Sequence, residues 1–423
     1  MNILIVGNGG RETAIARELS HSKKVHDLHM LPLNQAISSK VKAHNISIDD
    51  PDHILRFVKE NKIDLVVIGP EKPLVAGLAD ILRQNNIHVF GPSQKGAMLE
   101  GSKIYCKEFF ESAGVPTAKS IQVFSDDEIL EKSKAFSAPW VVKADGLASG
   151  KGVYICESNE DLVSAGRDLF VDKKLGETRV FLEEFIEGKE LSFLIVTNGS
   201  EYEALPIAQD HKRIFDNDKG PNTGGMGAVA PLNIPDELYQ KIRKEVVEKT
   251  LAQLKREKID YRGVIYFGLM IKDNQPYVLE INTRFGDPET QVILPLLDGD
   301  WADVFWNISQ GVVHQLKWKK LYATSVVMAA PGYPDRPEKD VFINGNIFDE
   351  KPGAYYISAG VKQNPHGQWV TNGGRVLNAV GISESAEKSI QMAYGYAEKI
   401  NWRGIQKRSD IGQKVLKKNE FKF

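Results

Sequence analysis

The first hundred residues alternate short apolar runs with amphipathic stretches, and this alternation limits the possible folds more than any other feature of the chain. Three apolar runs, each followed by glycine, lie at residues 3–6, 65–68 and 89–90. Between them apolar residues recur at helical spacing, for example Leu74, Leu78 and Leu82. Strands that alternate with helices in this way predict a small parallel α/β domain, Rossmann-like in architecture, over residues 1–101.

The pattern changes beyond Pro116 to one that predicts antiparallel hairpins. Strands are expected at residues 140–144, 152–156, 179–185, 191–196, 203–208, 264–271 and 277–282. Helices are expected at residues 102–112, 236–258, 288–296 and 301–310. A third unit begins near Thr324, with strands at residues 325–330, 354–359 and 375–380 and a helix at residues 383–400. We therefore expect a multidomain α/β and α+β protein, with a central region at residues 102–322, a small mobile lid at about 118–190, and a C-terminal α+β domain at 323–423.

Composition restricts the possible partners. A chain of 423 residues is too long for one hydrophobic core, and 42% hydrophobic residues are enough to fill several. Its 54 basic residues are balanced by 56 acidic ones, and the net charge of -2 gives no broad field that would attract nucleic acid or a membrane. We expect small-molecule substrates and neither a nucleic-acid nor a membrane partner.

The cysteines and the N-terminus point to a cytoplasmic protein. Cys106 and Cys156 show neither metal spacing nor a disulfide framework, which fits a reducing compartment. The chain enters a strand pattern at once, without a basic leader, and no apolar stretch is long enough to span a membrane. No strongly apolar stripe indicates an obligate oligomer, so we expect a monomer.

Polar side chains alternate with apolar ones in the strand that begins at Tyr277. Glu280, Asn282 and Arg284 should share one face, because side chains two apart along a strand point the same way. Hard oxygen ligands suit Mg²⁺ held together with nucleotide phosphates, and an arginine suits a phosphoryl oxygen. A half-exposed strand with a solvated polar face is the alternative that this segment alone leaves open.

A first glycine cluster, Gly7 to Glu12, lies between a predicted strand and a predicted helix. Such a turn lets backbone N–H groups approach a phosphate, and Arg11 is available for its charge. Dinucleotide binding fits poorly, because Glu12 occupies the third glycine position of that fingerprint. A phosphorylated small substrate fits better, and a tight turn without a ligand remains open.

Two further segments match a nucleotide. The loop from Lys143 to Gly152 does not follow the P-loop pattern, but a glycine-rich hairpin with lysines can close over a triphosphate. A strand at residues 180–190 ends in a carboxylate-rich turn, where Glu190 is placed for ribose hydroxyls. A mobile surface hairpin and a solvated strand end are the respective alternatives.

Taken together, these segments resemble the ATP-grasp ligases and, within them, the phosphoribosylamine–glycine ligase family of purine biosynthesis. The ordered matches run the whole length of the chain: GNGGRE at Gly7, IDLVVIGPEKPL at Ile63, FGPS at Phe90, EGSK at Glu100, KADGLASGKGV at Lys143, LEEFIEGKE at Leu182, QDHKR at Gln209, GPNTGGMGA at Gly220, EINTRFGDPETQ at Glu280 and NGGRV at Asn372. The resemblance implies a central ATP-grasp fold with a mobile lid.

The resemblance also implies roles for individual residues. Catalytic roles fall to Lys143 and Arg284, and Mg²⁺ or Mn²⁺ would bind Glu280 and Asn282. ATP, as co-substrate, would contact Lys103, Lys143, Gly150, Lys151, Gly152, Glu183, Glu184, Phe185, Ile186 and Glu190. Glycine and 5-phosphoribosylamine would lie near Gly9, Gly10, Arg11, Glu12, Asp210, Lys212, Arg213, Asn222, Gly224, Gly225 and Asp287. His211 in the same stretch has either a role there or a structural one.

Three positions depart from the family pattern. Leu33 and Ile37 replace glycines next to the expected sugar-phosphate site, so close backbone approach there is in question. Thr13 stands where the family usually has histidine, and Gly268 where many ATP-grasp enzymes have a second metal carboxylate. The last difference favours the glycine-ligase family.

The implied reaction uses ATP to phosphorylate the carboxylate of glycine, and the amine of phosphoribosylamine then attacks the glycyl phosphate. Products would be glycinamide ribonucleotide, ADP and phosphate. Two alternatives remain. An ATP-grasp carboxylase would share the nucleotide half and activate bicarbonate. A non-catalytic nucleotide-binding protein would bind ATP without turnover. Leu33 and Ile37 motivate this alternative, because they replace glycines next to the expected sugar-phosphate site.

Overall fold

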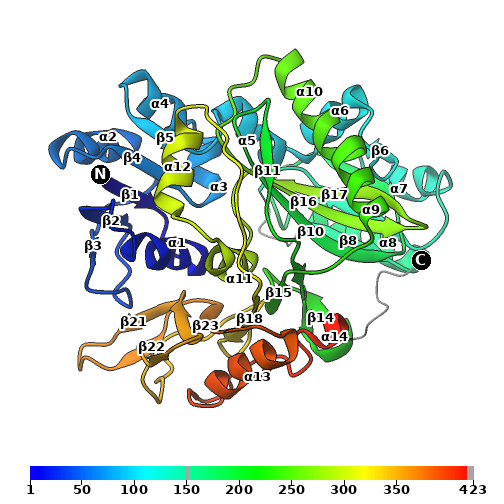
Figure 1. Cartoon of the computed structure of the whole chain (residues 1–423). Helices are drawn as coiled ribbons and strands as arrows, with labels where there is room; N and C mark the ends of the chain where they lie inside the picture. Colours follow the sequence, from blue (N-terminus) through cyan, green and yellow to red (C-terminus); the bar gives the residue numbers. More distant parts are fainter. Residues whose placement is uncertain (148–151, 177, 417–423) are drawn as a thin grey trace.

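The computed structural model describes residues 1–147, 152–176 and 178–416. In Figure 1 the N-terminal α/β unit, the central strands and the C-terminal strands are arranged around a common centre. The fold class is the expected one, an N-terminal parallel sheet followed by ATP-grasp and α+β regions.

The N-terminal unit is a five-stranded parallel sheet in the order β3-β2-β1-β4-β5. Its strands are β1 (Asn2–Val6), β2 (Asp27–Leu31), β3 (Val41–Ala43), β4 (Leu65–Ile68) and β5 (His88–Phe90). Helices α1 (Gly10–Ser20), α2 (Pro51–Glu60), α3 (Glu71–Val75) and α4 (Leu78–Gln84) connect them. Strands β1 and β4 are almost entirely buried, as continuous apolar runs in a parallel sheet require. The glycine cluster therefore lies at the carboxyl end of β1, the usual ligand edge of such a sheet.

Helices α5 (Gln94–Gly101) and α6 (Lys103–Ala113) lead to a four-stranded antiparallel sheet, which we call the lid sheet. Its order is β6-β9-β7-β8, from β6 (Ser120–Val123), β7 (Trp140–Ala144), β8 (Val153–Cys156) and β9 (Val180–Glu184). Helices α7 (Asp126–Ser133) and α8 (Asn159–Gly166), with a π-turn at Arg167–Val171, pack on it and were not expected from the sequence.

The central sheet is antiparallel, in the order β11-β10-β16-β17. It contains β10 (Lys189–Thr197), β11 (Tyr202–Ala204), β16 (Gly263–Lys272) and β17 (Gln275–Asn282), with β11 shorter than the predicted strand. The predicted long helix is a continuous run of α9 (Asp236–Ile242), a π-helical segment (Arg243–Glu248) and α10 (Lys249–Arg256). Its apolar face, including Leu238, Ile242 and Val246, packs in the core beneath this sheet.

A six-stranded sheet joins strands from both sides of residue 323, in the order β12-β15-β18-β23-β20-β19. They are β12 (Gln209–Asp210), β15 (Gly227–Ala230), β18 (Tyr322–Ala329), β19 (Glu350–Lys351), β20 (Ala354–Ser358) and β23 (Arg375–Ser383). Helix α13 (Ala386–Ala397) packs against it, and short α14 (Gln413–Leu416) follows. The division of the chain at residue 323 stays a prediction, since this sheet spans it.

The remaining elements connect these units. Helix α11 (Glu289–Ile293) packs between α1 and the six-stranded sheet, and α12 (Trp301–Ser309) packs between the N-terminal sheet and β16 of the central sheet, with a 3-10 turn at Leu294–Leu296 between the two helices. Two hairpins stand apart, β13 (Arg213–Phe215) with β14 (Lys219–Asn222) and β21 (Val361–Gln363) with β22 (Trp369–Thr371). A one-turn 3-10 segment at Asp216–Asp218 forms the tip of the first.

Within the part of the chain that the structure describes, none of the helices combines the length and the apolar character needed to cross a lipid bilayer.

Candidate active site

The end of strand β17 holds the residues predicted to bind a metal ion. Glu280 and Asn282 are on one face, because the buried residues Ile281 and Thr283 alternate with them. A β-bulge next to Gly268 of β16 lies just before Glu280 in the pairing of the two strands. Both candidate ligands therefore leave the strand on the same side.

Lys212 lies between the carboxylates of two strands. Its Nζ is 3.1 Å from Oε1 of Glu280 on β17 and 3.7 Å from Oε2 of Glu190 on β10. The Lys212 charge holds the pKa of Glu280 below its ordinary value, against the opposing effect of burial. A predicted metal ligand, a predicted ribose ligand and a predicted substrate ligand thus meet at one place.

The donors at β17 fit a divalent cation that also binds phosphates. The Glu280 side chain is 49% exposed, and the Asn282 amide has no hydrogen-bond partner within the described chain. In the same residues no group of three or more His, Cys, Asp or Glu side chains is placed to hold a metal ion. One carboxylate and one amide oxygen form the partial set that Mg²⁺ completes with water and substrate phosphates.

The two lysines predicted to contact phosphates converge on this strand end. Lys143, in β7, donates to the backbone oxygen of Leu279 at 3.1 Å and pairs with Glu183 at 2.6 Å. Lys103, in the first turn of α6, donates to the backbone oxygen of Gly146 at 2.7 Å. Both ammonium groups therefore lie where the lid sheet meets the central sheet.

The glycine-rich loop is tied at its base to the start of α6. Asp145 accepts a hydrogen bond from Ser102 Oγ at 3.0 Å and pairs with Arg179 at 2.7 Å. Of the predicted loop residues, Gly152 is buried, and two lie outside the described residues, namely Gly150 and Lys151.

The segment predicted to bind adenine lies where strand β9 leaves the lid sheet. Ile186 packs with Ala118 and Met270 in a small apolar cluster. Glu184 accepts a backbone hydrogen bond at 2.8 Å, and Phe185 is partly buried. An apolar patch beside an extended backbone is the surface that a purine ring requires.

On the opposite side, the glycine cluster at the start of α1 is braced by its own side chains. Glu12 accepts a hydrogen bond from the Gly9 backbone at 2.8 Å and pairs with Arg11 at 2.6 Å. Arg11 also donates to the backbone oxygen of Phe285 at 3.0 Å. The Arg11 side chain is only 9% exposed, and its described contacts link α1 to the segment after β17.

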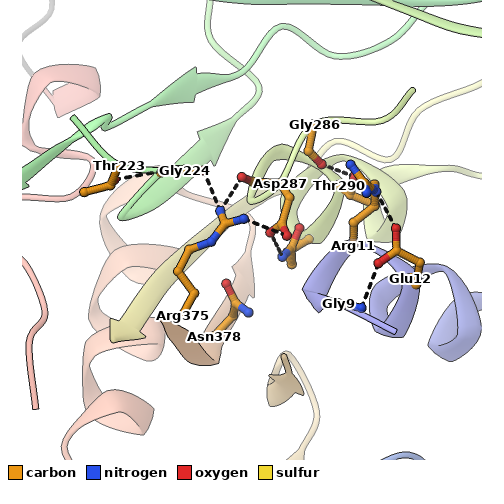
Figure 2. Close-up of polar contacts among 12 residues, drawn as sticks. Gly9, Arg11, Glu12, Thr223, Gly224, Gly286, Asp287, Thr290, Arg375 and Asn378 are labelled. Atoms are coloured by element: carbon orange, nitrogen blue, oxygen red, sulfur yellow. Dashed lines mark hydrogen bonds and ion pairs between the residues drawn. The ribbon is translucent and has the colours of Figure 1, made fainter. Parts of the chain in front are cut away.

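Figure 2 shows Arg375 of β23 reaching the same region from the six-stranded sheet. Its guanidinium pairs with Asp287 at 3.0 Å and donates to the backbone oxygen of Gly224. Asp287 also accepts a hydrogen bond from Gln291 at 2.7 Å. Arg375 holds the pKa of Asp287 below its usual range, although burial acts in the opposite direction. Three segments distant in the sequence are thereby joined at one arginine.

A cavity of about 480 Å³ opens beside this arginine, between the N-terminal sheet and the six-stranded sheet. Its lining includes Gly9 and Gly10 of the cluster, and also Leu33, Asp287, Lys362 and Arg375. A volume of this size accommodates a small phosphorylated sugar. We call it the acceptor cavity.

The two unusual residues of the loop after β2 are accommodated without backbone strain. Neither Leu33 nor Ile37 has a positive φ, so neither position needs glycine in this chain. Leu33 lines the acceptor cavity with 40% of its surface exposed, while Ile37 packs against the core. Leu33 therefore changes the surface of the cavity, and Ile37 does not reach it.

Arg284 is held by two carboxylates of the N-terminal unit. Its Nη2 is 2.8 Å from Glu100 and its Nε is 3.5 Å from Glu71. Glu100 also accepts a hydrogen bond from the Thr283 backbone at 2.7 Å. The predicted catalytic arginine is thus positioned by an ion-pair cluster rather than left free.

Asp210, in the edge strand β12 of the six-stranded sheet, lies against Gly225. Burial, with the nearby Glu289 carboxylate, raises the pKa of Asp210 well above its usual range. Gly225 has φ +109°, and a Cβ there would lie 2.8 Å from Asp210 and 2.4 Å from Pro288. Only glycine fits this approach.

The hairpin β13–β14 carries Arg213 and Asn222, which face each other in register. The C-terminal segment contacts the tip of this hairpin through the fully buried Arg408. Its guanidinium pairs with Asp218 of the tip at 2.9 Å and with Asp410 of its own segment at 2.6 Å. Arg408 also donates to the backbone oxygen of Arg213 at 3.1 Å. The C-terminal segment thereby fixes the hairpin that follows Lys212.

His211 has a structural environment. It is 1% exposed, and its Nδ1 lies 3.3 Å from the backbone oxygen of Gly227. Burial, reinforced by the positive charge of Arg408, lowers the pKa of His211 to about 4. The imidazole is therefore neutral near pH 7 and does not face the acceptor cavity lining.

We expect His211 to make folding stability depend on acidity. Between the ordinary pKa of 6.5 and the folded value of about 4, the unfolded chain binds a proton that the folded chain does not. This contribution is present above pH 6.5 and is lost as the pH falls towards 4, by roughly 3 kcal/mol in total. In urea titrations between pH 4 and 7, His211→Gln should flatten this dependence and the exposed His314→Gln should not; equal slopes in both would contradict the expectation.

Several residues of this region were given no role from the sequence. Arg375 lies in the quoted NGGRV match, Glu71 in IDLVVIGPEKPL and Glu100 in EGSK, so motif membership was the available signal. Lys107 and Arg408 lie in no quoted motif. Only the folded chain brings those two to their partners.

Comparisons with known proteins agree over the whole chain. Family models for the N domain, the ATP-grasp domain and the C domain of phosphoribosylglycinamide synthetase match residues 1–100, 101–290 and 323–414. A phosphoribosylamine–glycine ligase of Nostoc sp. is 42% identical over 425 residues, covering 98% of this chain and 100% of the relative. One from Halalkalibacterium halodurans is 39% identical, covering 98% and 97%.

Solved structures extend this agreement. The phosphoribosylamine–glycine ligase of Thermotoga maritima is 37% identical, with a TM-score of 0.86, 97% of this chain and 100% of that chain being covered. The biotin carboxylase domain of the Hydrogenobacter thermophilus 2-oxoglutarate carboxylase has a TM-score of 0.72 at 17% identity, covering 99% and 94%. The second likeness concerns the fold alone.

Proposed function

The chain belongs to the phosphoribosylglycinamide synthetase family, and from this premise we propose that it joins glycine to 5-phosphoribosylamine in purine biosynthesis, with ATP converted to ADP and phosphate. It is an ATP-dependent carbon–nitrogen ligase that acts on small molecules. The observation that carries the proposal is the convergence of Glu280, Lys143 and Lys212 at one strand end, in a chain that also has the acceptor cavity bordered by Arg375.

ATP is proposed to bind between the lid sheet and the central sheet. Lys103 and Lys143 would contact its phosphates, and the glycine-rich loop, including Gly150, Lys151 and Gly152, would cover them. The apolar cluster at Ile186 supports placing adenine beside residues 183–186. Glu190 near Lys212 supports placing the ribose at the start of β10.

Glu280 and Asn282 would hold Mg²⁺ or Mn²⁺ against the phosphates. When bound, such an ion draws negative charge away from the transferring phosphoryl group. The exposed carboxylate and the unpartnered amide within the described chain support this assignment.

Glycine and phosphoribosylamine are proposed to occupy the opposite side. The acceptor cavity would take the phosphoribosyl group, with backbone N–H groups of Gly9 and Gly10 at the start of α1 and the charges of Lys362 and Arg375 near its phosphate. The remaining residues proposed to face this side are Arg11, Glu12, Asp210, Lys212, Arg213, Asn222, Gly224, Gly225 and Asp287.

The chemistry overcomes the low reactivity of a carboxylate. A glycine carboxylate oxygen attacks the γ-phosphorus of ATP, the bond to the ADP oxygen breaks, and glycyl phosphate forms. The amine of phosphoribosylamine then attacks the acyl carbon, the C–O bond to phosphate breaks, and the amine loses a proton. The side chains of Lys143 and Arg284 neutralise the converging anions, and closure over the intermediate excludes water.

The domain division, the oligomeric state and the cellular location are also proposals. We propose a modular division into residues 1–101, 102–322 with a mobile lid at about 118–190, and 323–423. A monomer and a cytoplasmic location are proposed on the grounds of composition given above.

The decisive experiment measures ADP formation with each substrate omitted in turn. We expect turnover to require both glycine and phosphoribosylamine and to form glycinamide ribonucleotide in equal amount to ADP. Phosphate release that needs bicarbonate and ignores glycine would select a carboxylase instead. ATP binding without turnover in the complete mixture would select a nucleotide-binding protein.

Replacing Arg375 tests the acceptor side separately. Arg375→Ala removes the pair with Asp287 and the bond to Gly224, so we expect the KM for phosphoribosylamine to rise at least tenfold. The KM for ATP should stay within about twofold, because the contacts of Arg375 lie on the acceptor side. The exposed Arg403→Ala serves as the control, and an equal rise of both KM values would contradict the assignment.

A further inference from the structure

A buried cluster of three charges lies in the wall between α6 and the lid sheet. Glu183 of β9 is 2% exposed, and its two carboxylate oxygens are divided between two lysines. Oε1 is 2.6 Å from Nζ of Lys107 on α6, and Oε2 is 2.6 Å from Nζ of Lys143 on β7. Both lysine side chains are largely buried, at 12% and 11% exposure. Lys107 lies in none of the motifs quoted from the sequence.

The two ammonium groups differ in how many of their donors the protein uses. A lysine has three N–H donors. Besides its ion pair with Glu183, Lys107 donates two hydrogen bonds, to Thr117 Oγ1 at 2.7 Å and to the backbone oxygen of Ala118 at 2.8 Å. Besides its own pair with Glu183, Lys143 donates one within the described chain, to the Leu279 backbone at 3.1 Å. Lys143 therefore keeps more of its donors for a ligand than Lys107 does.

The net charge of the cluster depends on Lys107 as well. A Glu183–Lys143 pair by itself would be neutral, and its attraction for a phosphate would be largely cancelled. With Lys107 present, the cluster has one net positive charge in a region of low dielectric, where charges interact strongly. Burial alone would raise the pKa of Glu183, but the charges of Lys143 and Lys107 together hold it below its ordinary value.

We propose that Lys107 is a positioning residue for the nucleotide phosphates: it neutralises Glu183 and so keeps the charge and the remaining donors of Lys143 available to ATP. The inference rests on the proposed function in one respect, that Lys143 contacts the phosphates. It also assigns the Glu183 side chain to the two lysines rather than to adenine, since each of its oxygens lies 2.6 Å from a lysine ammonium group. Lys107 itself touches no ligand.

Nucleotide binding tests this independently of the ligase reaction. The probes are a non-hydrolysable ATP analogue and adenosine, measured by calorimetry with Mg²⁺ on the full chain. Lys107→Met should weaken binding of the ATP analogue about tenfold and leave adenosine binding within about twofold. In the double variant Lys107→Met with Glu183→Gln, the cluster again has one net positive charge, so affinity for the analogue should return to within about threefold of the parent.

A role confined to folding predicts a different result. It would lower the melting temperature of Lys107→Met, and the folded fraction would bind both probes as the parent does. Lys174→Met, which breaks an exposed ion pair with Asp168 in the same lid region, is the matched control for loss of a lysine charge. If Lys107→Met does not fold, Lys107→Gln, which keeps an amide donor without the charge, takes its place.

Two outcomes would overturn the proposal. One is unchanged affinity of the Lys107 variant for the ATP analogue. The other is a double variant as weak as the single one, because the effect would then not pass through Glu183. Failure of the ligase assay with normal nucleotide binding would remove the proposed function and leave this inference to be decided by the binding data.

Discussion

Replacing Glu280 by alanine is expected to lower kcat at least a hundredfold while the protein stays folded. The side chain is half exposed at a strand end, so its removal leaves no cavity in the core. It is the only carboxylate of the proposed pair of ligands, and losing a hundredfold corresponds to about 2.7 kcal/mol of transition-state stabilisation, within the range for charge-stabilising groups. Initial rates of ADP formation against Mg²⁺ and Mn²⁺ concentration measure the effect.

The dependence of activity on metal concentration distinguishes two roles of Glu280, that of a metal ligand and that of an ion-pair partner of Lys212. Loss of a ligand should raise the metal concentration needed for half-maximal activity, whereas loss of the 3.1 Å pair with Lys212 alone should not. Glu245→Ala is the control, because Glu245 accepts a 2.7 Å hydrogen bond from Gln275 at the other end of the same strand. Full activity of Glu280→Ala would remove the metal assignment.

Arg408→Met is expected to destabilise the protein by about 3–5 kcal/mol, since breaking a buried charge network leaves unpaired charges behind. The Arg408 side chain is fully buried, and the change would leave Asp410, which is 15% exposed, without its guanidinium partner, whereas Asp218 keeps its 2.6 Å pair with Lys414. Activity should fall with it, because the hairpin that follows Lys212 loses its anchor. The midpoint of unfolding in urea, followed by fluorescence, measures the loss.

A second arginine of the same segment supplies the control. Arg403 pairs with Glu338 at 2.6 Å, but its side chain is 74% exposed, so Arg403→Met should shift stability by less than about 1 kcal/mol. Adding Asp410→Asn to Arg408→Met should recover part of the loss, because Asp410 is the carboxylate that Arg408→Met leaves buried without an ion-pair partner. Equal midpoints for the two single variants would mean that the buried network does not stabilise the hairpin.

The sequence predicts most of the fold because its strongest signals are local. Continuous apolar runs mark β1, β4 and β5, and the alternation of Glu280 and Asn282 with Ile281 and Thr283 is enough to predict a shared face for the two polar residues. Helix α7 was not predicted, because Asp126, Asp127 and Glu128 fill its first turn and leave few apolar positions. Hairpin strand β14, exposed throughout, offers no apolar alternation at all.

The site could be predicted only where its residues lie together in sequence. Glu280 and Asn282 are two apart, so alternation alone relates them. Asp287 and Arg375 are separated by 88 positions, and Lys107 and Glu183 lie on different elements, so no spacing connects them. Their pairing depends on how sheets and helices pack. No short stretch of the sequence encodes that packing. Motif membership pointed to Arg375, and nothing pointed to Lys107.

The six-stranded sheet has a consequence for how substrates exchange. Strand β15, which follows the loop containing Gly224 and Gly225, and strand β23, which bears Arg375, belong to one hydrogen-bonded layer, and among the described residues this layer shares no strand with the lid sheet. If the lid sheet moves as proposed, it can do so without breaking a strand pairing of the six-stranded sheet that lines the acceptor cavity. Opening of the nucleotide side would then leave the shape of the acceptor cavity unchanged.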